Sequence, residues 1–162
     1  MPKKKVVIQI AGNPQYAKKT SPAEIILNPA TGLPSFGTFP AINLPNAVFI
    51  GGPIYLRYGK HDGANRGWGF EHIWQARFSH LPDKITARLD VINLVSSVLV
   101  PGAAIYYEFN TIGSAHRRAS VFRSSNGVLI VEERPDGANT VFYSVVTAIP
   151  SQKVYGQRIG TF

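Results

Sequence analysis

The sequence predicts an α+β fold, in which a proline-rich N-terminal arm is followed by two helices and then a four-stranded antiparallel meander. Three observations support this prediction. Six prolines punctuate residues 12–45, apolar residues recur at three- and four-residue spacing through residues 70–99, and short apolar runs separated by turn residues fill residues 103–149. A chain of 162 residues with 44% hydrophobic side chains can form one domain with a substantial core.

Residues 1–52 form the predicted arm. Val6–Ile10 is a short β-branched run typical of a strand, and Ala23–Leu27 is the one candidate for a turn of helix. The prolines exclude a long helix or a central strand, because each lacks a backbone N–H and has a fixed φ. Interspersed apolar residues such as Phe39 predict that the arm packs on the domain formed by residues 53–162.

Two short strands, Ala47–Ile50 and Ile54–Tyr58, are predicted to flank a Gly-Gly-Pro turn. A glycine-rich loop follows, and Phe70–Leu81 then has helical spacing. Asp83 is the predicted N-cap of a second helix, which ends at a Pro-Gly pair, Pro101–Gly102.

The meander is predicted from four alternating runs. Asn126–Gly127 is the strongest short hairpin signal in the chain. Residues after Ser151 are expected to form a loose tail. The four predicted strands are Ala103–Asn110, Arg117–Ser124, Val128–Arg134 and Thr140–Ile149.

The charge and composition favour a polyanionic partner. The formal net charge is +8, and Asp and Glu together number only nine, so nucleic acid is the first class to consider. The absence of cysteine excludes disulfides, thiolate metal ligands and a cysteine nucleophile. No segment approaches the ~20 apolar residues of a spanning helix, so we expect no membrane span.

Several catalytic chemistries lack their required residues. There is no GxSxG motif, and Gly59-Lys60 is followed by His61 instead of the Ser or Thr of a phosphate-binding loop. Nine scattered carboxylates do not favour paired-carboxylate catalysis. The histidines lack the spacing of a metal site, since His72 and His80 lie eight residues apart. We therefore expect neither a metal nor a cofactor.

The stretch Tyr55–Arg77 concentrates the remaining chemistry, with two of the four histidines, both tryptophans and four cationic side chains. Cleavage of RNA needs only such groups, because the 2′-OH of RNA is itself the nucleophile. An imidazole transfers the protons, and Arg or Lys stabilises the charge on the phosphate. The sequence thus points to RNA cleavage by elimination of the alternatives.

Each candidate residue also has a purely structural interpretation. His72, on the predicted helix, is either the catalytic imidazole or a half-buried core histidine, and His61 is either a catalytic group or a surface histidine. The cations that flank residues 117–123 are either phosphate ligands or protectors of an edge strand. Tyr143 and Thr147 share one face of the last predicted strand by simple alternation, and offer hydroxyls to a phosphate.

The order of these features resembles a known family. A histidine on a helix in GFEHI, a second helix, an arginine-bearing RRASVFR strand and a closing strand ending in Thr147–Ser151 are similar to the barnase/EndoU/colicin/RelE-like ribonuclease superfamily. The nearest likeness is to its phage-associated and polymorphic-toxin branches, which include the toxin domains of contact-dependent growth-inhibition systems. The lead-in GKHDGANRGWGFEHIW also looks like the glycine-rich approach to the helix in such toxins. The likeness covers about Pro53 to Ser151.

The resemblance implies roles for particular residues. His72 would be the general acid/base, joined by His61 or Lys60 from the loop, and Thr147 would bind the scissile phosphate. An arginine of the RRASVFR strand, Arg118 or Arg123, would clamp that phosphate. Many relatives carry an Arg-His pair one turn after the helix histidine, whereas here Phe78 follows Arg77. The residues expected to contact RNA are Lys60, Arg66, Arg77, Tyr143 and Ser151.

The resemblance implies a metal-independent endoribonuclease toxin domain that leaves a cyclic phosphate. Its target would be tRNA, and an acidic immunity protein would neutralise it. It would be a monomeric effector, secreted or delivered, that acts in the cytoplasm of a target cell. Two alternatives stay open: a structural phage protein that binds nucleic acid as an oligomer, and a non-catalytic binding module that stacks bases on Tyr106, Tyr107, Phe122 and Tyr143.

Overall fold

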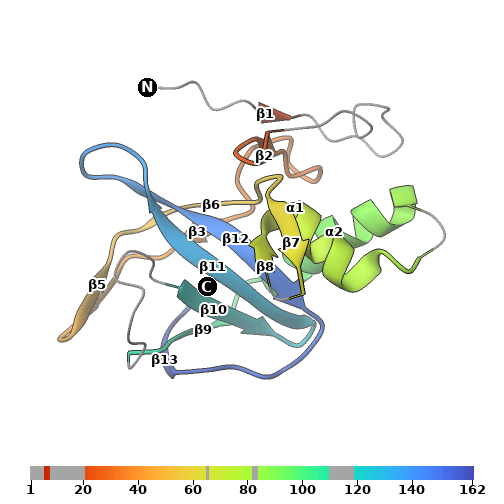
Figure 1. Cartoon of the computed structure of the whole chain (residues 1–162). Helices are drawn as coiled ribbons and strands as arrows, with labels where there is room; N and C mark the ends of the chain where they lie inside the picture. Colours follow the sequence, from red (N-terminus) through yellow and green to blue (C-terminus); the bar gives the residue numbers. More distant parts are fainter. Residues whose placement is uncertain (1–5, 8–20, 65, 82–83, 110–118) are drawn as a thin grey trace.

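The computed structural model describes residues 6–7, 21–64, 66–81, 84–109 and 119–162. Its main element is a seven-stranded mixed sheet in the order β13-β9-β10-β11-β12-β6-β3 (Figure 1). The bounds of these strands are β3 Thr38–Phe39, β6 Gly52–Tyr55, β9 Ala104–Tyr107, β10 Ala119–Ser124, β11 Gly127–Pro135, β12 Val141–Ile149 and β13 Gln157–Thr161.

The predicted α+β fold with a four-stranded sheet is therefore wrong. Strands β9 to β12 do pair antiparallel in sequence order, but they form only the middle of the sheet. β13 pairs with β9 at one edge, where a loose tail was expected, and β6 runs parallel to β12 near the other. Both additions are pairings between distant segments, which local alternation does not reveal.

The arm also differs from its prediction. β1 (Val6–Val7) pairs in parallel with β2 (Ile25–Ile26), which replaces the helical turn expected at Ala23–Leu27. β5 (Ala47–Phe49) pairs with β4 (Ile42–Leu44) and not with the strand that follows it. The strand that follows, β6, pairs instead with β12 on one side and β3 on the other. The predicted hairpin around the Gly-Gly-Pro turn therefore does not form.

The core joins the arm to the sheet through aromatic side chains. Phe39 stacks on Tyr143 with ring centroids 4.0 Å apart, and it meets the edge of Phe122 at 5.6 Å. Phe49, also from residues 21–52, packs in the same cluster. Each large aromatic side chain removed from water contributes about 2–3 kcal/mol, so these contacts hold the arm on the sheet.

The helical part consists of three elements. α1 (Gly69–Ile73) continues directly into a π-helix, η2 (Trp74–Phe78), where one continuous helix was predicted, and α2 (Lys84–Val98) follows. A small hairpin of β7 (Lys60–Gly63) and β8 (Arg66–Trp68) precedes α1 and lies beside it (Figure 1). Among the described residues, no helix combines the length and the apolarity needed to cross a bilayer.

The register of β12 divides the sheet into two faces. Val131 pairs with Val145, but its neighbour Ile130 pairs with Thr147, so Val146 is the extra residue of a β-bulge. Because paired residues share a face, the bulge puts Thr147 on the face opposite to Tyr143. We call the side bearing Tyr143 and Val145 the core face and the side bearing Ser144 and Thr147 the polar face.

Candidate acid–base site

Two histidines meet at the junction of the β7–β8 hairpin and α1. The Nδ1 atoms of His61 and His72 lie 3.1 Å apart, and their ring centroids lie 5.2 Å apart. His72 is buried, with 6% of its surface exposed, whereas His61 on β7 is half-buried. The two rings thus form a hydrogen-bonded pair with one buried and one accessible member, which we call the histidine pair.

Glycine at position 67 makes this approach possible. Gly67 pairs with His61 across the hairpin and has φ +136°, a conformation that side chains disfavour. A Cβ there would lie 2.8 Å from Nδ1 of His72 and would collide with the carbonyl oxygen of Lys60. Any side chain at this position would therefore push the hairpin away from His72.

The start of α1 is fixed by the segment that follows β6. The N–H of Phe70 donates to the carbonyl of Arg57 at 3.0 Å, and the N–H of Glu71 donates to that of Tyr58 at 2.9 Å. These two bonds satisfy donors that the first turn of a helix leaves without a partner. His72 consequently lies at a defined position relative to the sheet.

The environment of His72 lowers its pKa below the ordinary value of 6.5. Burial is the largest cause, because it disfavours the charged imidazolium, and electrostatic repulsion from His61 and then Arg77 acts in the same direction. A hydrogen bond with the backbone of Arg66 acts in the opposite direction. His72 is therefore held as a neutral imidazole at neutral pH and can accept a proton.

The π-helix η2 contributes the arginine to this environment. Its wider turn forms i→i+5 hydrogen bonds, and Arg77 follows His72 by five residues. Arg77 is half-buried, and its Nε has no hydrogen-bond partner among the described residues. The sequence predicted Arg77 as an RNA contact, but the helical spacing of residues 70–81 predicted a regular helix in place of this π-helix.

Arg57 anchors the hairpin to the polar face. Its Nε donates to Oγ of Ser144 on β12 at 2.8 Å, and its guanidinium lies 4.2 Å from the ring centroid of Trp68 on β8. Neither Arg57 nor Ser144 was predicted as a site residue, because 87 residues separate them and neither belongs to a motif. This contact links the hairpin to the strand that carries Thr147.

Thr147 remains a candidate ligand for a phosphate. It lies on the polar face of β12, a strand that both α1 and β8 contact. Its Oγ1 is buried and has no hydrogen-bond partner within the described part of the chain. A buried hydroxyl in this position is costly unless something else bonds to it.

Some predicted site residues lie elsewhere. Tyr143 is fully buried on the core face, and its hydroxyl donates to the carbonyl of Ile50 at 2.6 Å, so its predicted RNA contact is wrong. Simple alternation predicted that Tyr143 and Thr147 share a face, but the bulge at Val146 puts them on opposite faces of β12. Phe122 is likewise fully buried and cannot stack a base. Arg118 lies outside the described residues.

The remaining predicted residues differ in exposure. Arg66 and Lys60 are exposed beside the histidine pair, and Nζ of Lys60 lies 3.1 Å from Oδ2 of Asp62. Ser151 follows β12, and its Oγ accepts a hydrogen bond from the N–H of Lys153. Arg123 on β10 lines a separate cavity instead of the histidine pair.

Within the described ranges, no three His, Asp or Glu side chains are grouped as ligands for a metal ion. Comparison with protein-family models, with curated proteins and with solved structures gives no match for this chain. Function must therefore be argued from the site itself.

Proposed function

We propose that this domain is a metal-independent endoribonuclease and that the histidine pair performs its proton transfer. The observation that carries the proposal is the 3.1 Å contact between Nδ1 of His61 and Nδ1 of His72. Such a contact requires one Nδ1 atom to donate and the other to accept, so one proton lies between the two Nδ1 atoms. The pair can therefore take up or release a proton as a unit.

The substrate class follows from what accompanies the pair. RNA needs a base to remove the proton from its 2′-OH, and neutral His72 with the more accessible His61 supports that role. The 2′-oxygen then attacks phosphorus, the bond to the 5′-oxygen breaks, and a 2′,3′-cyclic phosphate remains. The departing 5′-oxygen takes a proton from water on the opposite side of phosphorus, and the histidine pair keeps the proton removed from the 2′-OH until solvent accepts it.

Positive charge around the pair favours an anionic substrate. Lys60 and Arg66 are exposed on the hairpin, and Arg77 is close enough to lower the pKa of His72. Cations and a hydroxyl such as that of Thr147 stabilise the charge that develops on the phosphate oxygens. The net charge of +8 draws RNA to this surface from a distance.

The biological setting is part of the same proposal. The resemblance of residues 53–151 to toxin ribonucleases supports a delivered effector that cleaves tRNA in the cytoplasm of a target cell. The excess of basic over acidic residues supports neutralisation by an acidic immunity protein.

The test is cleavage of total tRNA in EDTA by the wild-type protein, His72→Ala and His61→Ala. We expect the wild-type protein to cleave and to leave cyclic phosphate ends, and each alanine variant to lose about 10²- to 10⁴-fold in rate. His80→Ala is the matched control, because His80 is exposed on the segment that follows η2. Intact tRNA with the wild-type protein would reject the proposal, and full activity of both variants would reject the role of the pair.

A further inference from the structure

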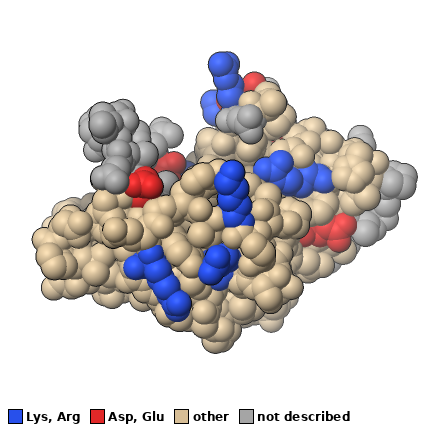
Figure 2. Space-filling view, turned by 90° about the horizontal axis from the view of Figure 1, so that it is seen from below, with Lys and Arg blue, Asp and Glu red and all other residues tan. Residues whose placement is uncertain are grey.

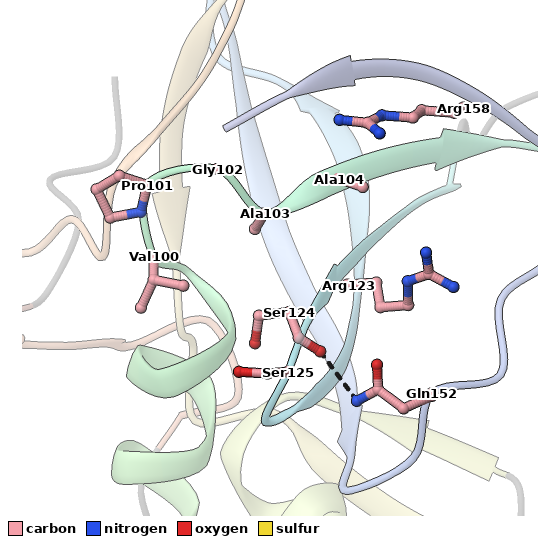
Figure 3. Close-up of a pocket in the computed structure, with 10 residues that line it drawn as sticks. All are labelled: Val100, Pro101, Gly102, Ala103, Ala104, Arg123, Ser124, Ser125, Gln152 and Arg158. Atoms are coloured by element: carbon pink, nitrogen blue, oxygen red, sulfur yellow. Dashed lines mark hydrogen bonds between the residues drawn. The ribbon is translucent and has the colours of Figure 1, made fainter.

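A polar cavity lies beside β9, β10 and β13, apart from the histidine pair. It has a volume of about 450 Å³, and none of its lining residues belongs to the β7–β8 hairpin or to α1 (Figure 3). We infer that it is a subsite for an RNA phosphate other than the one that is cleaved, an inference that rests on the proposed ribonuclease function. The side chains that carry the argument are those of Arg123, Ser124, Ser125, Gln152 and Arg158.

The strand register places two arginines over one small residue. Arg123 on β10 pairs with Ala104 on β9, which pairs in turn with Thr161 on β13. Arg158 pairs with Tyr106, two residues along β9 from Ala104, and its Nη2 donates to Oγ1 of Thr161 at 3.0 Å. Both arginines therefore lie on the polar face, on the strands either side of β9, and both line the cavity together with Ala104 (Figure 3).

Both arginines are available to an anion. Among the described residues, no carboxylate pairs with Arg123 or Arg158. The guanidinium of Arg123 lies 5.2 Å from the ring centroid of Tyr106, an arrangement that orients it and leaves its N–H groups at the edge. Two unpaired guanidinium groups in one cavity are a recognised arrangement for phosphate.

Polar groups complete the cavity and close one side of it. Nε2 of Gln152 donates to the carbonyl of Ser124 at 2.9 Å, which holds the segment after β12 against β10. Ser125 adds an exposed hydroxyl. Viewed from below, the molecule shows Lys and Arg side chains spread over this face, with fewer Asp and Glu side chains visible (Figure 2).

The position of the cavity favours RNA over an acidic protein. Thr147, Ile130, Val121, Tyr106 and Arg158 form one row across five strands, so Arg158 and Thr147 lie on the same face, about 19 Å apart. An RNA strand with one phosphate near Thr147 extends beyond that site. On the polar face, Arg123 and Arg158 offer a second cationic site to another of its phosphates. A cavity of about 450 Å³ is also a better binding site for one nucleotide than for the flat surface of a partner protein.

The test is the binding of a short, non-cleavable 2′-O-methyl oligonucleotide, measured by fluorescence anisotropy at several salt concentrations. We expect the double variant Arg123→Gln/Arg158→Gln to bind about tenfold more weakly, with a salt slope smaller in magnitude by about 0.7 for the one phosphate contact that is lost. Arg134→Gln is the matched control, because Arg134 lies on the same face but is paired with Glu132 at 3.1 Å. Its affinity should stay within about twofold.

A cleavage assay separates this subsite from the site of reaction. A dinucleoside monophosphate has only the phosphate that is cleaved, so the double variant should cleave it at the wild-type rate. The KM of the double variant for long RNA should rise. Loss of dinucleotide cleavage would overturn the inference, since it would put Arg123 at the scissile phosphate. Unchanged oligonucleotide binding would also overturn it and would leave the cavity to an acidic protein. Arginine-dependent binding without any RNA cleavage would support the phosphate subsite and reject the ribonuclease.

Discussion

The histidine pair and the cavity lined by Arg123 and Arg158, which we call the arginine cavity, are built by different means. The histidine pair depends on backbone segments that approach more closely than any side chain allows, as at Gly67, where a Cβ would meet both Lys60 and His72. The arginine cavity depends on strand register, which sets Arg123 and Arg158 on one face, with a β-bulge between Arg158 and Gly160 in the pairing of β13 with β9. The first arrangement is therefore sensitive to small backbone changes, and the second to the charge of its side chains.

The largest effect is expected from Gly67→Ala. The new Cβ would collide with the carbonyl of Lys60 and would lie 2.8 Å from Nδ1 of His72, so the two rings must separate. We expect cleavage to fall by about 10²-fold and the free energy of unfolding to fall by roughly 1–3 kcal/mol. Single-turnover cleavage and urea denaturation measure the two losses.

Gly63→Ala is the control for that substitution. Gly63 lies in the same hairpin with φ +123°, but nothing stands within 4 Å of its added Cβ. It should therefore lose a similar amount of stability through backbone strain and keep cleavage within about threefold. Equal losses of cleavage from both substitutions would show that the close contact at Gly67 is not what matters.

The next effect tests the anchor between the hairpin and the sheet. Arg57→Lys removes the bond from Nε to Ser144 and the planar contact with Trp68, although it keeps the charge. We expect a loss of about 1–2 kcal/mol in the free energy of unfolding. Arg134→Lys keeps a charge that can pair with Glu132, so it should cost about 0.5 kcal/mol or less. Equal urea midpoints for the two variants would contradict the anchoring role.

A third experiment uses the lowered pKa of His72. If neutral His72 is required, the acidic limb of the cleavage rate lies below pH 6.5, because the pKa of His72 is lowered from that value. Arg77→Gln removes one cause of the lowering, so the limb should move to higher pH, toward 6.5. Arg66→Gln changes an exposed side chain whose backbone, not its charge, contacts His72, and it should leave the limb in place. A limb that moves equally in both variants would contradict this assignment.

The smallest effect concerns the exposed ion pair of the hairpin. The side chains of Lys60 and Asp62 are 56% and 53% exposed, so Lys60→Gln should change the free energy of unfolding by less than about 0.5 kcal/mol. Relative to the wild-type protein, the variant should nevertheless cleave RNA severalfold more slowly at low salt. This difference should disappear at high salt, because salt screens the attraction between an exposed charge and RNA. A salt-independent loss would mean that Lys60 contacts the phosphate directly.

Local sequence signals predicted the regular part of the sheet. The turn at Asn126–Gly127 and the alternation on either side of it correspond to β10 and β11 with their antiparallel register. The same signals predicted a strand at Ile54–Tyr58, which overlaps β6, but not its parallel pairing with β12, and they missed β13 altogether. A parallel pairing with β12 and an edge pairing with β9 leave no local pattern. The predicted fold was wrong for this reason.

The candidate site was predicted in part. The density of His, Arg, Lys and Gly in Tyr55–Arg77 identified the region, but not the contact between His61 and His72, which depends on the hairpin. Simple alternation put Tyr143 beside Thr147, and the bulge at Val146 put them on opposite faces. A bulge of one residue has no clear sequence signal here, since valine occupies both Val145 and Val146.

The most direct test of the account is a double-mutant cycle on RNA cleavage with His61→Ala, His72→Ala and the double variant. If the histidines act as one proton-transferring unit, the double variant should be no slower than the slower single variant. Losses that multiply would contradict the account, because they would assign the two rings independent roles. A wild-type protein that leaves RNA intact would contradict it altogether.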